Sequence, residues 1–294
     1  MMLTYETAVI LVCILSVVLC AGLAVWRKLG WQTGLGMGAL SLLLCMLCAR
    51  GYYLLVCGMG GFWGSLFPAQ PYYYAFGGGI LGFLLALFLT SRLFRKPFAA
   101  VADAFSPVGL FAIAGLRMTE TLSDFGWGDF VEAAWLQRYP FAIQNMYVEW
   151  CAAVFNLEAL CALIILAALV IAGSRLNGRR LQTGLTWWCV TQIFCESLRV
   201  ESIQWGFVRV QQLHCAILLA VLLLCTLRTG RRKKALSSWI GLLSGAGLVV
   251  FLEYAIDKMP WPTFLNYVAM AVVLGVIGWC VQRMLVPASK TVQA

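Results

Sequence analysis

We single out six ionisable side chains in the long apolar stretches of this chain. They are Arg50, Asp103, Arg117, Glu158, Glu196 and Arg199. A charged side chain inside a bilayer is costly unless it is paired or wetted, so each is a candidate functional residue. A guanidinium group presents a planar fork to phosphate and stays charged in a dry site. Arg117 and Arg199, with Arg50 as a third, therefore predict a site for the phosphate of a lipid headgroup.

A purely structural role for these charges is the alternative. Glu196 and Arg199 are three residues apart on one helical face, so they can pair with each other or converge on a common ligand. In the structural alternative, Arg50 pairs with Glu158 and Arg199 pairs with Glu196, which holds helices in register. Buried ion pairs are weak stabilisers, and this favours the binding role for the set as a whole.

Two further polar features receive separate interpretations. For Asp103 a structural role is favoured, because Arg95 and Lys96 lie one or two helical turns away. Beyond Arg199, a polar run continues into the next apolar stretch, through Glu201, Arg209, Gln211 and Gln212.

Membrane-spanning helices must position these residues. Hydrophobic residues make up 62% of the 294-residue chain, and its mean hydropathy is +0.88. This is far above the composition of a soluble domain. Windows of about 20 apolar residues, each enough for one crossing, lie near 5–26, 33–56, 72–94, 99–117, 149–173, 182–199, 210–227, 236–255 and 264–287. The sequence predicts an all-α polytopic membrane bundle with nine spans.

Basic residues predict the orientation of the bundle. Five clusters hold fifteen of the 21 Lys and Arg residues, near positions 27–28, 92–96, 175–180, 228–234 and 283–290. All five fall on one side if the helices alternate, which is the positive-inside pattern. We therefore expect an N-terminus outside and a C-terminus inside the cytoplasmic membrane, and a first span that is retained rather than removed as a signal peptide. The net charge of +9 needs no nucleic-acid partner to explain it.

The loops and cysteines add weaker indications. The loops near 58–71 and 118–148 are expected outside, the first in the headgroup layer and the second as an amphipathic arm on the outer leaflet. The twelve cysteines are scattered through apolar stretches, so disulfides are not expected. His214 is the chain's only histidine and cannot build a zinc site by itself. We expect no metal and no cofactor.

Glycine spacing predicts close helix contacts. Gly78 and Gly82 have the G-x-x-x-G spacing that lets two helices approach closely in lipid. The triple glycine Gly77-Gly78-Gly79 follows three tyrosines at a helix mouth and is less ordinary. It suggests a place where a headgroup approaches the backbone.

Several of these elements together resemble the prolipoprotein diacylglyceryl transferase family. The resemblance is carried by CARGYYLLV and by the run AFGGGILGFLLALFLTSRLFRKPFAAVADAFSPVGLFAIAGLRMTETLSDFGWG, and it covers about residues 45–228. The matching positions are Arg50, Gly78, Gly79, Gly82, Asp103, Pro107, Arg117, Gly128, Glu158, Glu196, Arg199 and Gln212. Each motif is weak alone, and their shared order and spacing make the combination more specific.

The chain also departs from the family pattern. Gly77 stands where the family has the histidine of its H-G-G motif, and Thr119-Glu120-Thr121 replaces a G-N-F tripeptide. Phe125 aligns with the signature glutamate, and an H-P pair before the Glu158 helix is missing. The domain organisation predicted from the resemblance is a seven-helix transferase-like domain over 1–235, followed by two additional helices over 236–294.

The resemblance implies transfer of the diacylglyceryl group of phosphatidylglycerol to the cysteine thiol of a prolipoprotein signal peptide. Arg117 and Arg199 would hold the phosphate, and Glu120, with Glu196 and Glu201 as substitutes, is the candidate base for the thiol. Residues implied in substrate binding are Arg50, Gly78, Gly79, Glu158, Glu196 and Gln212. Two alternatives remain open: a repurposed relative that binds lipid or signal peptide without catalysis, and a transporter, which the lack of an inverted repeat disfavours.

Overall fold

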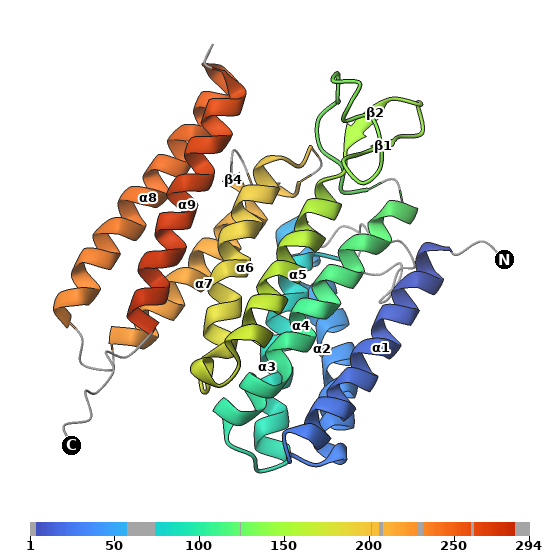
Figure 1. Ribbon diagram of the computed structural model, residues 1–294, viewed down its shortest axis with the longest axis vertical. Coiled ribbons are helices and arrows are strands. Elements are labelled where there is room, and N and C mark those ends of the chain that lie inside the picture. The colour runs from blue at the N-terminus through green and yellow to red at the C-terminus, as the bar shows by residue number, and fades with distance from the viewer. Residues whose placement is uncertain are drawn as a thin grey trace.

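The apolar windows fold as helices, because a segment in lipid has no water to satisfy its backbone N–H and C=O groups. The computed structural model describes residues 4–57, 74–123, 125–200, 202–205, 208–227, 232–259 and 262–285. In these ranges nine long α-helices occur (Figure 1): α1 (Tyr5–Trp26), α2 (Trp31–Cys57), α3 (Phe76–Leu93), α4 (Phe98–Thr119), α5 (Val154–Ala172), α6 (Arg180–Ser197), α7 (Val210–Leu227), α8 (Arg232–Lys258) and α9 (Thr263–Leu285). The predicted all-α membrane bundle is confirmed. The loop predicted in the headgroup layer, 58–71, lies outside the described residues.

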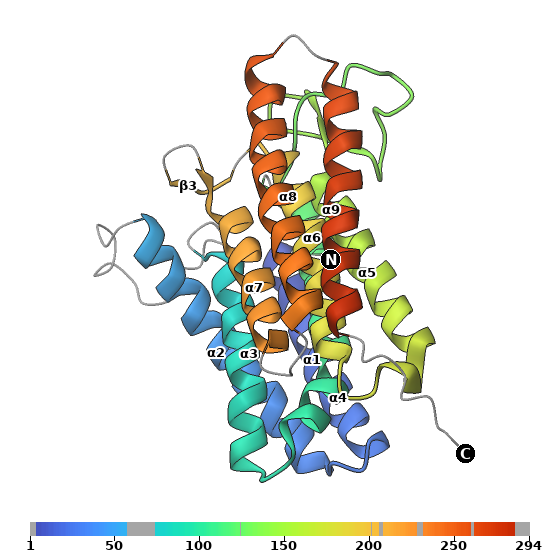
Figure 2. The same cartoon turned by 90° about the vertical axis from the view of Figure 1, so that its left-hand side faces the viewer.

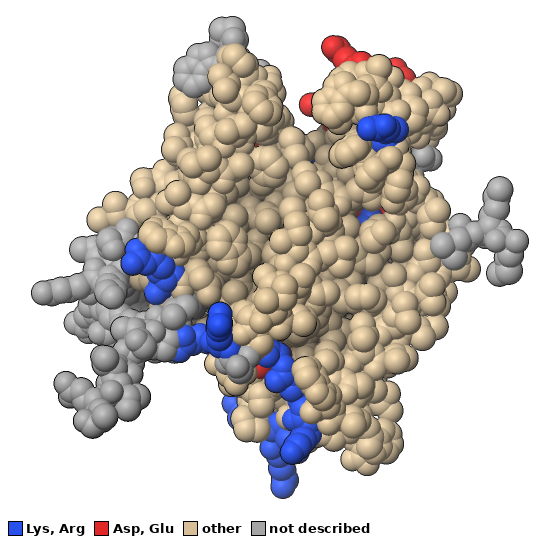
Figure 3. Space-filling view, viewed as in Figure 1, with Lys and Arg blue, Asp and Glu red and all other residues tan. Residues whose placement is uncertain are grey.

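Successive helices run in opposite directions, so the bundle has two distinct ends. The C-terminal ends of α2, α4 and α6 lie at the same end as the starts of α3, α5 and α7 (Figure 1). We call this the loop end. Lys and Arg side chains gather at the opposite end, which we call the basic end, whereas acidic side chains are visible at the loop end (Figure 3). The predicted catalytic residues Arg117, Glu120 and Arg199 belong to helix termini or loops of the loop end.

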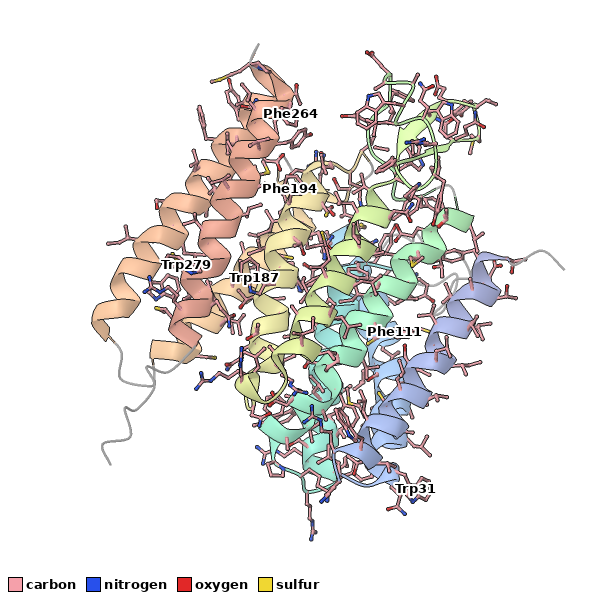
Figure 4. All side chains as sticks on the ribbon, in the orientation of Figure 1. Trp31, Phe111, Trp187, Phe194, Phe264 and Trp279 are labelled. Carbon is pink, nitrogen blue, oxygen red and sulfur yellow. The ribbon has the colours of Figure 1, made fainter. Side chains whose placement is uncertain are left out.

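The helices form two packed groups that share α4 and α6. One apolar cluster is built mainly from α1 to α4 around Leu87 and Phe105, and another from α5 to α9 around Leu219 and Met270. Helices α8 and α9 run side by side and cover α6 and α7 (Figure 2). At the α6–α9 contact, the Phe194 ring lies edge-on to Tyr267 at 6.3 Å between centroids (Figure 4). The two C-terminal helices are thus packed on the rest of the bundle.

Among the described residues, seven helices are long and apolar enough to cross a membrane. Helix α7 is apolar over Val210–Cys225. Helix α6 falls short because it carries polar side chains, of which Arg180, Gln192 and Glu196 are buried. It can carry them because α4, α5, α7 and α9 pack around it and separate much of its surface from lipid. That α6 and α7 span the membrane stays a prediction.

The connection between α4 and α5 contains a hairpin that the sequence reading missed. Strands β1 (Ala142–Gln144) and β2 (Trp150–Ala152) pair antiparallel, with Ile143 opposite Cys151. The Asn145 side chain accepts hydrogen bonds from the backbone N–H groups of Tyr147 (2.9 Å) and Glu149 (3.0 Å), which closes the turn. The fifth predicted window began at 149, but α5 begins at Val154, because residues 150–152 form β2.

Strand β2 is also part of a longer pairing that reaches the end of α6. The Gly128 N–H donates to the Ala152 carbonyl at 2.8 Å, and Gly128 also forms a β-bridge with Arg199. A second, smaller hairpin, β3 (Gln204–Trp205) with β4 (Val208–Arg209), joins α6 to α7. The loop near 118–148 was expected as an amphipathic arm on the outer leaflet, which stays a prediction. Part of this loop pairs with residues that follow α6.

Asp103 has partners that differ from the prediction. Its carboxylate accepts hydrogen bonds from the backbone N–H groups of Gly178 and of Arg180, the latter at 2.9 Å. These are N–H groups at the start of α6, where a helix leaves donors without internal partners. The expected partners of Asp103, Arg95 and Lys96, are therefore wrong. The contacts with the start of α6 are nonetheless of the structural kind that was expected.

Candidate active site at the loop end

Four buried charged side chains form a closed alternating network at the loop end. Arg117 Nη1 lies 2.5 Å from Glu120 Oε1, and Arg117 Nε is in a salt bridge with Glu158 Oε2. Arg199 Nη2 lies 2.8 Å from Glu158 Oε1 and 3.5 Å from Glu120 Oε2. Each carboxylate thus contacts both guanidinium groups. We call Arg117, Glu120, Glu158 and Arg199 the quartet.

Each member of the quartet is held by the end of a different element. Arg117 lies in the last turn of α4, Glu120 in the 3₁₀ turn that follows, Glu158 in the first turns of α5, and Arg199 two residues beyond α6. Their side chains are 6%, 17%, 2% and 11% exposed, respectively. Two positive and two negative charges cancel, which is the arrangement that makes buried charges tolerable.

The walls of the quartet come from α3 and from the loop after α4. The guanidinium carbon of Arg117 lies 4.0 Å from the ring centroid of Phe76, in a cation–π contact. Gly126, at φ +81°, approaches so closely that a Cβ there would touch Glu120 Oε2 and lie 3.2 Å from Arg199 Nη1. Glycine is therefore required at this position both by the backbone angle and by the lack of space.

Arg199 retains hydrogen-bonding capacity that its carboxylate partners do not use. Its Nη2 contacts both carboxylates, but its Nε is buried and has no acceptor among the residues that the structure describes. A buried guanidinium N–H without an acceptor is costly, so such a donor indicates a place for an anionic or carbonyl oxygen. The quartet can therefore hold its own charges in place and still bind an anion.

The structural pairings expected from the sequence are wrong. Both salt-bridge partners of Glu158 are arginines, Arg117 and Arg199, rather than Arg50. Arg199 pairs with Glu158 and Glu120 rather than with Glu196. The pairing pattern depends on where the ends of α4, α5 and α6 meet, which spacing along one helix does not reveal.

The other predicted binding residues surround the quartet to different degrees. Arg50 is 7% exposed near the end of α2 and lies over the Tyr53 ring at 5.7 Å. Glu196 is 5% exposed, and its backbone carbonyl accepts a hydrogen bond from Arg209 Nη1. The predicted substitute base Glu201 lies outside the described residues.

Gln212 belongs to a second polar cluster. Its Nε2 donates to Glu253 Oε1 at 2.6 Å and to Ser197 Oγ at 2.9 Å, and Ser197 Oγ also contacts Glu253. Arg209 connects this cluster to the quartet, because its Nε lies 4.0 Å from Glu253 Oε2 and its Nη1 donates to the backbone carbonyl of Arg199 at 2.7 Å. Sequence reasoning missed Glu253, although it is an ionisable residue inside the 236–255 window.

Comparison with known proteins identifies the fold that carries this arrangement. Residues 3–228 match the prolipoprotein diacylglyceryl transferase family. The chain belongs to this family. The match includes all four quartet residues and ends at the basic end, before α8.

Individual relatives of the family are similar to this chain at low identity. A phosphatidylglycerol–prolipoprotein diacylglyceryl transferase of Legionella pneumophila (strain Lens) is 28% identical over 134 residues, which cover 46% of this chain and 52% of that protein. A protein of the same name from Clostridium novyi (strain NT) is 23% identical over 203 residues, or 65% of this chain and 77% of that protein. The chain thus spans about half the length of the Legionella relative.

The family's glycine motif has three distinct surroundings in this member. A Cβ at Gly78 would lie 2.6 Å from Tyr52 Cβ and 2.7 Å from Ala49 Cα, and one at Gly82 would lie 2.6 Å from Cys45 Cα. The predicted G-x-x-x-G contact, here between α3 and α2, is confirmed. Among the described residues, nothing lies within 4 Å of a Cβ at Gly79, whereas Gly77 faces α7. Within the part of the chain that the structure describes, Gly79 is the one of the three consecutive glycines that leaves room for a ligand to approach.

The site shows no arrangement typical of a metal centre. Within the described ranges, no group of three or more His, Cys, Asp or Glu side chains has the geometry to hold a metal ion. All twelve cysteines are unpaired.

Proposed function

We propose that the chain transfers the diacylglyceryl group of phosphatidylglycerol to the cysteine thiol of a prolipoprotein signal peptide. One observation carries the proposal: two buried guanidinium groups are fixed side by side at the loop end, and Arg199 Nε lacks an acceptor among the described residues. A phosphate is an oxygen-rich anion that suits such donors. The names of the relatives supply the donor lipid and the acceptor.

In the proposed reaction the thiolate sulfur forms a bond to the carbon of the diacylglyceryl group that carries the phosphate. The carbon–oxygen bond to phosphate breaks, and glycerol phosphate leaves with the electron pair. Negative charge grows on the departing phosphate, so guanidinium groups fixed beforehand stabilise the transition state more than the bound lipid. Arg117 and Arg199 take this role, and Glu120 and Glu158 fix their orientation. The base role expected for Glu120 stays a prediction.

Substrates need lateral access from the membrane to the quartet. Figure 3 shows a notch at the loop end, between the ends of α8 and α9 and the lobe formed by the α4–α5 connection. We assign lipid and signal-peptide access to this notch. Arg50 and the open backbone at Gly79 are proposed to contact the headgroup, and Glu196 and Gln212 to support the site from α6 and α7.

The same proposal fixes the setting of the reaction. The loop end faces outward from the cytoplasmic membrane and the basic end faces the cytoplasm, with the N-terminus outside and the C-terminus inside, in accordance with the positive-inside rule. Residues 1–235 form the transferase domain, and residues 236–294 add the helix pair α8–α9.

Transfer of labelled diacylglycerol from phosphatidylglycerol to a lipobox peptide by the purified protein tests the proposal. We expect labelling by the wild type and a loss of at least about 100-fold in Arg117→Ala, the typical cost of removing one transition-state donor. Arg138→Ala is the matched control, because Arg138 is an exposed arginine of the same connection. Arg117→Ala also leaves the Glu120 carboxylate without this partner. The double variant Arg117→Ala/Glu120→Ala removes that carboxylate, so a loss of transfer that persists in it is due to the missing guanidinium group.

The alternative function is binding without catalysis. The replacement of the family histidine by Gly77 favours it. Under this alternative, the wild type retains labelled phosphatidylglycerol but transfers nothing to the peptide, and Arg117→Ala weakens lipid binding. That outcome would overturn the transferase proposal.

A further inference from the structure

The position at which the family histidine is missing is filled by a different histidine. A Cβ built on Gly77 would lie 3.0 Å from Gln211 Oε1, 3.2 Å from His214 Nδ1 and 3.3 Å from His214 Cγ. The imidazole ring of His214, from α7, thus occupies the volume into which a side chain at position 77 of α3 would begin to project. Sequence alignment does not reveal this, because the two positions are more than 130 residues apart.

His214 is buried and has an unused nitrogen. The residue is 6% exposed, and its Nε2 has no hydrogen-bond partner among the residues that the structure describes. Its ring lies edge-on to Tyr52 of α2, at 5.5 Å between centroids. A neutral imidazole with its proton on Nδ1 presents an acceptor at Nε2. A purely structural histidine would have this nitrogen satisfied, since buried polar groups are normally hydrogen-bonded.

The first turn of α3 connects this imidazole to the quartet. A Cβ at Gly77 would contact His214, and the ring of its neighbour Phe76 lies against the guanidinium group of Arg117, at 4.0 Å from the ring centroid. The same turn therefore borders both Arg117 and the imidazole.

We propose that His214 accepts the proton of the acceptor thiol, in place of a side chain at position 77. The proposal rests on the transferase function proposed above. The sulfur–hydrogen bond breaks, the proton goes to Nε2, and the thiolate attacks the glycerol carbon as the carbon–oxygen bond to phosphate breaks. The proton then leaves the imidazolium for the departing phosphate. Imidazole suits this step because its ordinary pKa lies near neutrality, below that of a free thiol.

Glu120 is the competing base, and its contacts distinguish the two candidates. Glu120 Oε1 lies 2.5 Å from Arg117 Nη1, and Glu120 Oε2 lies 3.5 Å from Arg199 Nη2, in an ion pair without a hydrogen bond among the described residues. His214 Nε2 has no such commitment among the described residues. The structure therefore assigns Glu120 to holding the arginines and His214 to the proton.

A relocation experiment tests the proposal. In the lipobox-peptide assay, we expect His214→Ala and His214→Gln to lose at least about 100-fold in transfer rate, the usual contribution of a general base, with retention of phosphatidylglycerol unchanged. Gly77→His alone clashes with the His214 ring and loses activity. In the double variant Gly77→His/His214→Ala, the new imidazole takes the space that the His214 ring vacates, and most of the transfer rate returns.

The controls separate the possible failures. Cys215→Ala changes a fully buried neighbour on α7 and should keep its activity. If His214→Ala does not fold, His214→Gln decides, because glutamine keeps size and polarity but cannot take up the proton. Full transfer by a folded His214 variant, or no recovery in a folded double variant, would overturn the role of His214 alone. Absence of transfer by the wild type would overturn the transferase function and, with it, this role.

Discussion

At the scale of single residues, the two positive and two negative charges of the quartet balance each other, and Glu158 contributes most to that charge balance. It is the least exposed member, and it contacts both arginines. A buried ion pair adds little net stability, but removal of one partner leaves an uncompensated charge. The identity of each side chain therefore matters more than the number of salt bridges.

Glu158→Gln is expected to destabilise the protein by about 3–5 kcal/mol, because two guanidinium groups lose a shared carboxylate in a buried site. The double variant Glu158→Gln/Arg117→Gln restores charge balance and should regain part of this loss. Denaturant unfolding in detergent, monitored by tryptophan fluorescence, measures the stability of the single and the double variant. Strictly additive effects of the two substitutions would contradict the coupled network.

Gly126→Ala is expected to abolish transfer, although it adds only one methyl group. The new Cβ meets the Glu120 carboxylate and comes within 3.2 Å of Arg199, and the φ of +81° disfavours alanine. Gly173→Ala is a control at another positive φ, 49°, with open space around it. A similar loss of transfer in both variants would show that backbone strain, rather than contact with the quartet, is responsible.

The sequence predicted the members of this site better than their contacts. Arg117, Glu158 and Arg199 were singled out because charges in apolar stretches are rare enough to notice. Glu120 was singled out as a candidate base three residues from Arg117. Their partners were not predicted, since they depend on the tertiary arrangement of three helix ends. Nothing in the sequence pointed to Gly126, because its role follows only from its short distance to the Glu120 side chain in the folded protein.

At the scale of elements, α8 lies beyond the family match and still contacts the polar cluster beside the quartet. Glu253 holds Gln212 and faces Arg209, which in turn donates to the backbone carbonyl of Arg199. Arg209 thereby satisfies carbonyls that α6 leaves unpaired at its C-terminal end. The helix pair α8–α9 is thus connected to the quartet through one arginine.

Glu253→Gln should lower the transfer rate by about 10-fold, roughly the effect of weakening one charge-assisted hydrogen bond, and leave retention of phosphatidylglycerol nearly unchanged. The expected cause is a looser placement of Arg199. Glu132→Gln, at an exposed position of the α4–α5 connection, is the control. Weaker lipid retention with an unchanged rate would instead place Glu253 in lipid binding.

Helices were easier to predict than the strands that join them. The apolar windows coincide with α1 to α9 to within a few residues at most ends, because lipid enforces long helical runs. The strands β1 and β2 have three residues each and are fixed by Asn145 and by pairing of β2 with Gly128 and Phe130. Such short segments carry too few residues for an alternating pattern to be recognised.

At the scale of the whole molecule, charge is divided between the two ends. Basic side chains gather at one end, and the hairpin and the quartet lie at the other (Figure 3). An epitope inserted between Tyr147 and Val148, both exposed at the hairpin tip, should bind antibody added outside intact spheroplasts. One inserted between Asn177 and Gly178 should need permeabilised cells. The reverse pattern would invert the proposed orientation.

The polarity of α6 also has a consequence for how the protein is made. An arginine or an acidic residue near the middle of a nascent span disfavours its partition into lipid by about 2.5–3.5 kcal/mol, and less towards the ends. Helix α6 carries Arg180 and Glu196 at its two ends and a buried Gln192 between them. Its neighbours α4, α5, α7 and α9 provide the surroundings that these groups need, and two of them are synthesised after it. A ribosome that has just completed α6 therefore holds a segment whose packing partners are incomplete, and we expect its stable insertion to depend on α7 and α9, which are synthesised later.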